Sequence, residues 1–344
     1  MRDFGVIVIG RNEVQRLREC LDSALASTAK VVYVDSGSAD GSPELARSIG
    51  VEAISLDMSR PFTAGRARNE GFARLLEQWP DLEYVQFVDA DCNLDADWFT
   101  KAIDALEGDD RLTVVCGRRR ERRPDASVYN RLCDLEWDTP KGDAKTCGGD
   151  AMMRVAPLQQ VKGFDPSIIA GEEPDLCVRL RAKGWKVYRL DAQMTLHDAA
   201  MTRFSQWWLR AVRGGHAYAE GAWLHGRGAE HHCVRAVTSI FAWAVLLPIL
   251  AVVVVIGAKA WGLLLLMVYP LQWWRVSRRK RLIGYAPSLA RWFALFIMLG
   301  KFAGAVGMMR FAWSRLWGRP STVIEYKGPD PSAVAGPAPD HISS

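Results

Sequence analysis

The sequence lacks the signatures of several common enzyme classes. It contains no G-x-x-x-x-G-K-[ST] and no G-x-G-x-x-G motif, so neither a P-loop nor a dinucleotide-binding fold is supported. Its seven cysteines form no C-x-x-C pair and their number is odd. We therefore expect reduced thiols in a cytosol-facing domain instead of a disulfide framework. Met1 leads almost directly into an apolar strand pattern, so we expect no signal peptide.

Acidic residues are almost missing from the C-terminal part of the chain. Between Lys259 and Lys327 only Glu325 is acidic, and the net charge of +5 arises in this part. Basic residues that flank long apolar runs are typical of proteins at membranes with anionic headgroups. We therefore expect membrane lipids, and no nucleic acid, as partners.

The first 235 or so residues alternate short apolar runs with amphipathic segments. Apolar runs at 4–9, 31–34, 51–56 and 84–89 predict strands, and the intervening segments predict helices. Strands and helices that alternate with short connections predict a mostly parallel α/β sheet with right-handed crossovers.

Two carboxylates lie at the end of the strand predicted at 84–89: Asp89 is its last residue, and Asp91 follows two positions later. In open α/β sheets ligands bind beyond the carboxyl ends of the strands, so both side chains should project into a cleft. Hard oxygen ligands there suit Mg²⁺ or Mn²⁺ held with substrate phosphates. The alternative is that the two residues only begin a solvated turn. The polar clusters at Gly10–Glu13 and Asp35–Ser38 follow two other strands and should reach the same edge.

Three later segments carry further candidates. Glu172 and Glu173 open a helix with Pro174 in its first turn, where acids also serve as ordinary capping residues. His197 lies just beyond a strand expected at 184–190, either as a structural residue or as a third metal ligand. The basic run 118–123 is expected to be a solvated loop, with a contact to an anionic acceptor or to membrane phosphates as the alternative.

The order of these motifs resembles glycosyltransferase family 2. The matching segments are Val6–Ile9 with Asn12 and Glu13, Val34-Asp35 with Gly37-Ser38 and Asp40-Gly41, Arg66–Gly71, Asp89-Ala90-Asp91, Gly163-Phe164-Asp165, Glu172–Leu176 with Arg179-Leu180, and Gly184. The resemblance implies a GT-A-type fold, a Rossmann-like mixed and mostly parallel sheet flanked by helices. It also implies a nucleotide-sugar donor and an Mn²⁺ or Mg²⁺ cofactor.

The resemblance also implies roles for individual residues. Asp35 would face the nucleobase, and Asp89 would contact the ribose or the metal. Asp91 and His197 would ligate the metal, and Glu173 would be the catalytic base. The remaining candidates for donor or acceptor binding are Asn12, Glu13, Arg66, Arg68, Asn69, Arg210 and Arg213.

Two departures from the family pattern leave assignments open. The base position commonly carries Asp, whereas here Glu173 precedes a proline, so Glu172 is a rival. Ser36 stands where a second Asp is common, which leaves the choice of nucleobase open.

The C-terminal part predicts membrane attachment. Ala236–Ala258 carries no charge and is long enough to cross a bilayer, and the shorter apolar run at 261–274 should return the chain. Basic residues from Arg275 to Arg281 follow, and the positive-inside tendency places them in the cytosol. The apolar run at 289–311 contains Lys301, and we favour an interfacial helix over a third span.

These features divide the chain into four parts. We expect a catalytic domain at 1–232, a transmembrane hairpin at 233–275, a basic loop with a third apolar helix at 276–327, and a disordered tail at 328–344. The catalytic domain should face the cytosol at the inner membrane. We expect an inverting transferase that acts on a lipid-linked saccharide in surface-glycan synthesis. The alternatives are a sugar nucleotidyltransferase and a non-catalytic membrane scaffold.

Overall fold

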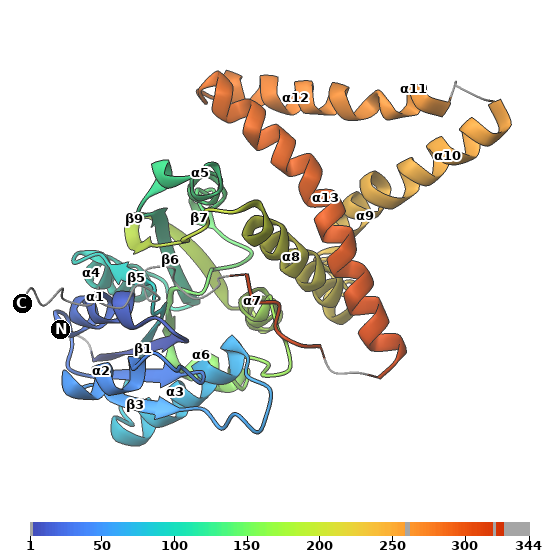
Figure 1. The fold of residues 1–344 in the computed structure, drawn as a ribbon. Coiled ribbons are helices and arrows are strands. Elements are labelled where there is room, and N and C mark those ends of the chain that lie inside the picture. Colours follow the sequence, from blue (N-terminus) through green and yellow to red (C-terminus); the bar gives the residue numbers. More distant parts are fainter. Residues whose placement is uncertain (1–2, 259–261, 319–320, 327–344) are drawn as a thin grey trace, which may run out of the picture.

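The chain folds into an α/β domain from which a helical arm projects (Figure 1). This description comes from a computed structural model, which describes residues 3–258, 262–318 and 321–326. The expected disordered tail at 328–344 lies outside the described residues.

A nine-stranded mixed sheet forms the centre of the domain, with the strand order β3-β2-β1-β4-β8-β6-β9-β5 and β7 beside β9. The pairs β3–β2, β2–β1, β1–β4 and β6–β9 are parallel, whereas β8, β5 and β7 pair antiparallel with their neighbours. The strands are β1 (Phe4–Gly10), β2 (Val31–Asp35), β3 (Glu52–Ser55), β4 (Tyr84–Asp89), β5 (Cys92–Leu94), β6 (Leu112–Glu121), β7 (Gly142–Asp143), β8 (Ala151–Arg154) and β9 (Lys186–His197).

Helices cover both faces of the sheet and continue into the arm (Figure 1). Those of the domain are α1 (Val14–Leu25), α2 (Ser42–Ser48), α3 (Ala64–Gln78), α4 (Trp98–Gly108), η1 (Pro124–Ala126), α5 (Val128–Glu136), α6 (Val155–Gln160), α7 (Glu172–Ala182) and α8 (Phe204–His225). They are followed by α9 (Val234–Phe241), η2 (Ala242–Leu246), α10 (Leu247–Ala258), α11 (Leu263–Leu266), α12 (Val268–Leu282) and α13 (Pro287–Leu316).

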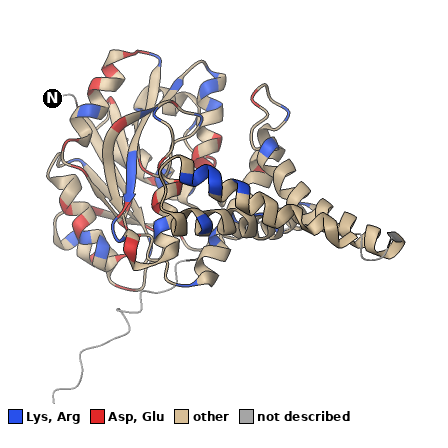
Figure 2. Ribbon diagram, turned by 90° about the horizontal axis from the view of Figure 1, so that it is seen from above, with Lys and Arg blue, Asp and Glu red and all other residues tan. Residues whose placement is uncertain are grey.

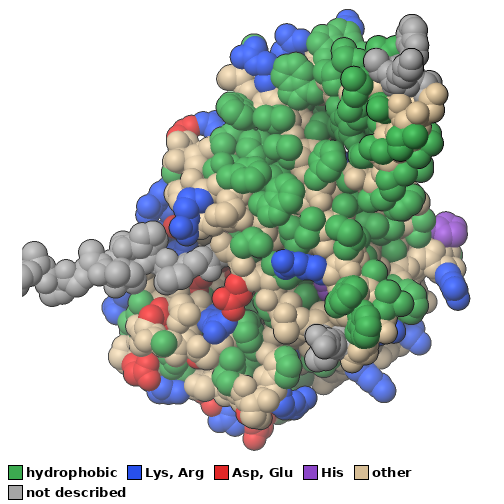
Figure 3. Space-filling model, turned by 45° about the vertical axis from the view of Figure 1, so that its right-hand side comes forward, with side chains coloured by type: hydrophobic (Ala, Val, Ile, Leu, Met, Phe, Trp, Pro, Cys, Tyr) green, Lys and Arg blue, Asp and Glu red, His purple; other side chains and the backbone are tan. Residues whose placement is uncertain are grey.

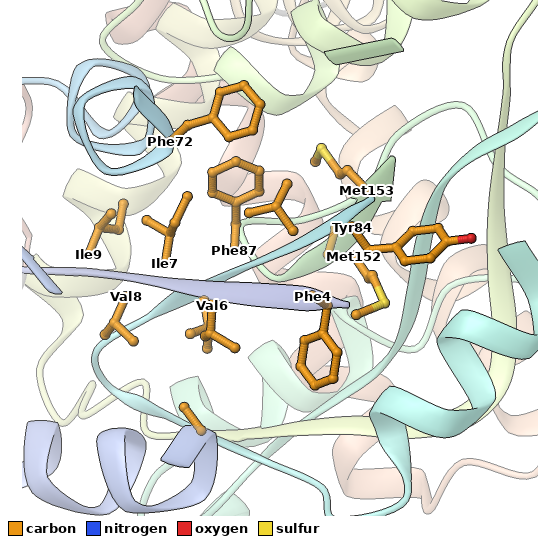
Figure 4. Close-up of a cluster of buried hydrophobic side chains, with 14 of the residues drawn as sticks. Phe4, Val6, Ile7, Val8, Ile9, Phe72, Tyr84, Phe87, Met152 and Met153 are labelled. Carbon is orange, nitrogen blue, oxygen red and sulfur yellow. The ribbon is translucent and has the colours of Figure 1, made fainter. Parts of the chain in front are cut away.

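The main core lies on both faces of β1 and β4 (Figure 4). Successive side chains of β1 alternate between the faces, so that Ile7 meets Phe72 and Phe87 while Phe4 lies on the opposite side. Phe4 stacks on Phe99 of α4, with 4.6 Å between the ring centroids. Because both faces are covered, β1 is apolar along its whole length, as expected of a central parallel strand.

Two expectations about the strands were wrong. The basic run does not form a solvated loop, because β6 continues through it to Glu121 and pairs with β9. His197 does not follow its strand but is the last residue of β9, where it pairs with Cys92 of β5. The longer strands bring Arg119 and His197 to the sheet edge at which β4 ends.

Beyond the domain, α10, α11 and α12 form the projecting arm. Figure 2 shows its outer part without charged side chains among the described residues, and with Lys and Arg at its base. Apolar side chains cover this side of the molecule (Figure 3), and Val252, Ile256 and Leu264 are more than half exposed. The base of the arm lies near α13, which packs along α8 through a buried cluster that includes Val212 and Ala303.

Two helices of the described residues are long and apolar enough to cross a membrane, Val234–Gly257 and Pro287–Leu316. The first corresponds to the predicted first span. The expected return span at 261–274 is not one continuous helix, because α11 ends at Leu266 and α12 begins at Val268 and runs on into the basic segment. The third apolar run is a helix of 30 residues, and its fit to a span rests on length and composition alone.

Candidate functional site

A cavity of about 1140 Å³ opens beyond the carboxyl ends of β1 and β4 and extends to α8 and α13. Most of the residues predicted from the sequence line it. These are Asn12, Glu13, Arg68, Asp89, Asp91, Glu172, Glu173, His197, Arg210 and Arg213. Asp35, Arg66 and Asn69 are not among the residues that line it.

Asp91 and His197 face each other at the inner end of this cavity. The distance from His197 Nε2 to Asp91 Oδ2 is 3.3 Å, and both side chains are buried. Burial, with the nearby Arg119 cation, lowers the pKa of His197 to about 4, so its imidazole is neutral at physiological pH. A neutral imidazole beside a carboxylate is a suitable donor pair for a divalent cation.

Cys92 completes a three-residue group whose candidate ligand atoms lie within 4.8 Å of one another. Burial raises the pKa of the Cys92 thiol well above its usual range. A soft sulfur ligand also suits Mg²⁺ and Mn²⁺ less well than oxygen does. The metal-binding character of the group comes from Asp91 and His197.

Asp89 lies between two arginines. Its carboxylate accepts hydrogen bonds from Arg68 Nη2 at 3.1 Å and from Arg119 Nη2 at 3.4 Å. Arg119 also pairs with the fully buried Asp150 at 2.7 Å. Asp150 Oδ1 in turn accepts the backbone N–H of Asp89 at 3.1 Å, so the Arg119–Asp150 pair fixes the end of β4 from two directions.

Arg119 and Asp150 were not predicted as site residues. Arg119 lies within a basic run that is typical of a solvated segment, and Asp150 follows two glycines without any obvious partner in the sequence. That single acid was the only available signal. Its counter-ion is more than 30 positions away and on another strand, so it could not be identified from local pattern.

The two glutamates at the start of α7 have different surroundings. Glu172 is buried and accepts a hydrogen bond from Arg68 Nη1 at 2.7 Å. Glu173 lies 3.4 Å from Arg68 Nη2, and its side chain is more exposed, at 16% against 3% for Glu172. Burial, together with the negative charge of Glu172, raises the pKa of Glu173 to about 7. A carboxylate of this pKa in a cavity can accept a proton near neutral pH.

Asp35 and Asn12 shape the loops at the cavity rim. Asp35 Oδ2 accepts the backbone N–H groups of Gly37 and Ser38 at 3.0 and 2.9 Å. Asn12 has a left-handed backbone with φ 56°, and its side chain accepts the N–H of Ala39 at 2.9 Å. Asp35 therefore closes the turn after β2, and Asn12 holds that turn against the turn after β1. Their predicted contacts with a nucleotide stay predictions.

Asn69 and Arg66 point away from the cavity. Asn69 donates to the carbonyl of Phe164 at 2.7 Å and accepts its N–H at 2.9 Å, which ties α3 to the loop before α7. Arg66 donates to the carbonyl oxygens of Arg60 and Pro61 at 3.2 and 3.4 Å and lines a second cavity. The sequence left open whether Arg66 or Arg68 lines the nucleotide pocket, and of the two Arg68 lines the cavity that contains Asp91.

The outer half of the cavity is amphipathic. Phe293, Phe296 and Ile297 of α13 form an apolar wall, and Arg210 and Arg213 of the adjacent helix α8 also line the cavity. Arg210 is paired with Glu136 at 2.7 Å. Among the described residues, no carboxylate lies within ion-pair distance of Arg213.

A C-terminal strap, residues 321–326, crosses from the end of α13 back to the cavity. Ile324 is buried in the cluster between α8 and α13, while Val323, Glu325 and Tyr326 line the cavity. Glu325 is ion-paired with Arg11 directly after β1. Tyr326 packs in the same cluster as Trp137, whose ring makes an edge contact with His197 at 4.6 Å. The strap therefore reaches both the rim and the Asp91–His197 end of the cavity.

Part of the chain matches a known protein family. Residues 5–155 match the family described as Glycosyl transferase family 2. A TPR repeat-containing protein of Synechococcus elongatus is 26% identical over 140 residues, which cover 41% of this chain and 33% of that protein. The chain thus spans about a third of the length of this curated relative.

The chain is also similar to solved structures. The mannosyltransferase PcManGT from Pyrobaculum calidifontis, in complex with GDP-Man and Mn²⁺, has a TM-score of 0.59 at 17% identity, with 90% of this chain and 88% of that chain covered. S. aureus TarS 1–349 in complex with UDP-GlcNAc has a TM-score of 0.48 at 16% identity, with 93% of each chain covered. The similarity to PcManGT shows a shared fold.

Proposed function

We propose that this enzyme transfers a sugar from a nucleotide-diphosphate donor to a hydroxyl of a lipid-linked saccharide, with inversion. Residues 5–155 match glycosyltransferase family 2, and the expected GT-A-type fold is confirmed. One observation carries the proposal. A neutral histidine paired with a carboxylate, Asp91–His197, shares a cavity with Glu173, a carboxylate whose pKa is raised.

The donor set fits a divalent cation. His197 Nδ1 is a buried nitrogen without a hydrogen-bond partner among the described residues, and Nε2 faces Asp91. We assign Asp91 and His197 as the residues that would hold Mn²⁺ or Mg²⁺, with Asp89 beside them. When bound, the cation would supply charge neutralisation for the diphosphate leaving group.

Glu173 has the features of the general base. In its ionised form it would take the proton of the acceptor hydroxyl as the oxygen attacks the anomeric carbon of the sugar. Arg68 holds Glu172 and Asp89 on either side and so fixes the position of Glu173. No separate nucleophile is needed, so we propose a single displacement that inverts the anomeric carbon.

The apolar wall of the cavity favours a lipid-linked acceptor. Phe293, Phe296 and Ile297 would contact hydrocarbon, while Arg213 would meet an anionic group at its head. Ile297 is 38% exposed and Phe293 is half-buried, so this part of the wall would face water beside a soluble saccharide. A lipid-linked acceptor fits the expected role in assembly of a surface glycan.

The uncharged arm favours attachment to a membrane. We propose that α10 with α11 and the first part of α12 enters the bilayer as a hairpin, while α13 lies at the surface against α8. Lys and Arg at the base of the arm would then lie beside the cytosolic headgroups (Figure 2). The catalytic domain would face the cytosol, where nucleotide sugars are made.

The direct test is a hydrolysis and transfer screen. The purified full-length chain in detergent is offered a panel of UDP-, GDP- and dTDP-sugars with Mn²⁺ or Mg²⁺, and release of nucleoside diphosphate is measured. We expect one donor to be turned over, activity to be lost in a chelator, and Asp91→Asn to lose cation-dependent nucleotide binding. Asp97→Asn, which makes the same change at an exposed position outside the cavity, is the matched control. Full activity in the chelator would contradict the metal assignment, and no turnover of any donor would contradict the transfer reaction.

A further inference from the structure

A second cavity, of about 400 Å³, lies where the start of α3 meets α8 and the C-terminal end of α13. Three arginines line it, Arg60, Arg66 and Arg315. It shares only Ile169 with the described lining of the cavity that contains Asp91. Its lining is therefore not explained by sugar transfer.

Arg66 is the most informative of the three. Arg66 is only 6% exposed. Among the described residues, its guanidinium donates hydrogen bonds to two carbonyl oxygens, and its Nε has no hydrogen-bond partner. Among the described residues no carboxylate lies within ion-pair distance of its guanidinium. Asp57 lies near enough for Arg66 and Arg60 to lower its pKa, but its carboxylate is on the surface and is bound by Ser59. Buried charges in proteins are normally paired, so Arg66 indicates an anion that binds in the cavity.

The other residues that line the cavity do not provide a negative charge to pair with Arg66. Of the described residues that line the cavity, Glu220 alone is acidic, and burial raises its pKa to about 7. Its Oε2 faces His216 Nδ1 at 3.7 Å and accepts no hydrogen bond from the described residues. Arg315 lies over the ring of Trp223 at 5.1 Å, with no carboxylate of the described part of the chain at ion-pair distance. The cavity therefore has an excess of positive charge.

An exposed tryptophan lies beside this cavity. Trp223 of α8 is 64% exposed and contacts Phe311 and Arg315, which line the cavity. Met309, Trp313 and Leu316, on the other side of α13, are also more than half exposed. Tryptophan is enriched where a protein surface meets the headgroup level of a bilayer. Arginine is the side chain best suited to bind phosphate oxygens in a fork.

We propose that this second cavity binds the phosphate of an anionic membrane phospholipid, with Arg66, Arg60 and Arg315 as its ligands. The site would fix α13 and the start of α3 at one depth relative to the membrane. The inference rests on the membrane-attachment part of the proposed function and is independent of the sugar donor.

The test compares lipid-dependent stability of the full chain. Protein is reconstituted into nanodiscs of phosphatidylcholine alone or with phosphatidylglycerol, and the unfolding midpoint Tm is measured. We expect phosphatidylglycerol to raise Tm, and we expect Arg66→Gln and Arg315→Gln each to lose at least half of that rise. Arg291→Gln removes the same charge from an exposed position of α13 outside both cavities, and should keep the full rise.

Each other result overturns the inference or one part of it. Equal Tm values in the two nanodiscs, or an equal loss in Arg291→Gln, would refute a specific site. The same rise with glycerol phosphate in detergent would assign the cavity to a free phosphate instead of a lipid. If Arg66→Gln does not fold, Arg66→Lys and Arg315→Gln decide the question. Failure of the chain to enter nanodiscs would instead refute membrane attachment. Absence of donor turnover would refute sugar transfer, but it would not affect the conclusion about lipid binding in the second cavity.

Discussion

Arg68 holds the two neighbouring glutamates of α7 in different ways. Its guanidinium is buried and meets three carboxylates, with Glu172 at 2.7 Å, Asp89 at 3.1 Å and Glu173 at 3.4 Å. Glu172 is held most closely and is the most buried, so it serves as a fixed counter-ion. Glu173 keeps a longer contact and an exposed edge, which fits its proposed role as the base.

This difference predicts the pH dependence of the reaction. A base with a pKa of about 7 is about nine-tenths protonated at pH 6 and about nine-tenths ionised at pH 8. Because only the ionised form accepts a proton, kcat/KM should rise by up to about tenfold per pH unit below 7 and level off above it. A pH profile of kcat/KM with saturating cation measures this directly.

Substitution separates the two glutamates. We expect Glu173→Gln to lower kcat by about 10²–10⁴-fold and to abolish the pH dependence near 7, with donor affinity unchanged. Glu172→Gln is the matched control, and we expect it to keep the pH dependence while it weakens the structure around Arg68. Near-normal turnover in Glu173→Gln with no turnover in Glu172→Gln would reverse the assignment.

Some residues of the site could be predicted from the sequence and others could not. Asp89, Asp91 and Glu173 each follow a strand or begin a helix, so their place at one sheet edge follows from the alternation of elements. Arg66 and Arg68 are two positions apart on α3 and cannot be distinguished by spacing. Only the packing of α3 shows that one side chain reaches the Asp91 cavity and the other reaches the second cavity.

At the scale of elements, β6 is the least expected feature. Arg118, Arg119 and Arg120 are consecutive in one strand, and of the three side chains that of Arg119 reaches the buried Asp150. Register shifts in the pairing of β6 with β9 occur on both sides of Arg118. A basic run is normally solvated, and nothing local in the sequence shows that its middle residue has a counter-ion on another strand.

The buried pair predicts a large difference between adjacent arginines. Arg119→Ala leaves Asp150 fully buried without its cation, and we expect it to lower the free energy of unfolding by about 3–5 kcal/mol. Arg120→Ala changes an exposed side chain on the same strand and should cost less than about 0.5 kcal/mol. Denaturant titration of both variants measures the difference. Equal effects would show that the Arg119–Asp150 contact does not contribute to stability.

At the scale of the whole molecule, the chain combines a covered α/β domain with an arm that has no covering of its own. Val252 and Val253 are 58% and 57% exposed, although they lie in the middle of an uncharged helix. Composition alone predicted this arm, because an uncharged run of this length is typical of a segment that crosses a bilayer. The helices from α11 to α13 could not be predicted, because their ends do not coincide with the ends of the apolar runs in the sequence.

Membrane attachment through the arm can be tested by charge. An aspartate near the middle of a membrane helix costs about 2.5–3.5 kcal/mol. We therefore expect the double substitution Val252→Asp and Val253→Asp to move the chain from the membrane fraction to the soluble fraction. Thr100→Asp, on the exposed side of α4, is the control and should leave the distribution unchanged. Retention of the double variant in salt-washed membranes would contradict insertion of α10.

The strap at 321–326 connects α13 with the Asp91–His197 end of the cavity through side-chain contacts. Any tilt or shift of α13 that pulls on Ile324 would also move Tyr326 against Trp137, which contacts His197, and would draw Glu325 away from Arg11. Bilayer thickness and lateral pressure would thereby become variables of cation and nucleotide affinity. Enzyme shortened after Trp317 for easier handling would have a different binding cavity from that of the intact polypeptide.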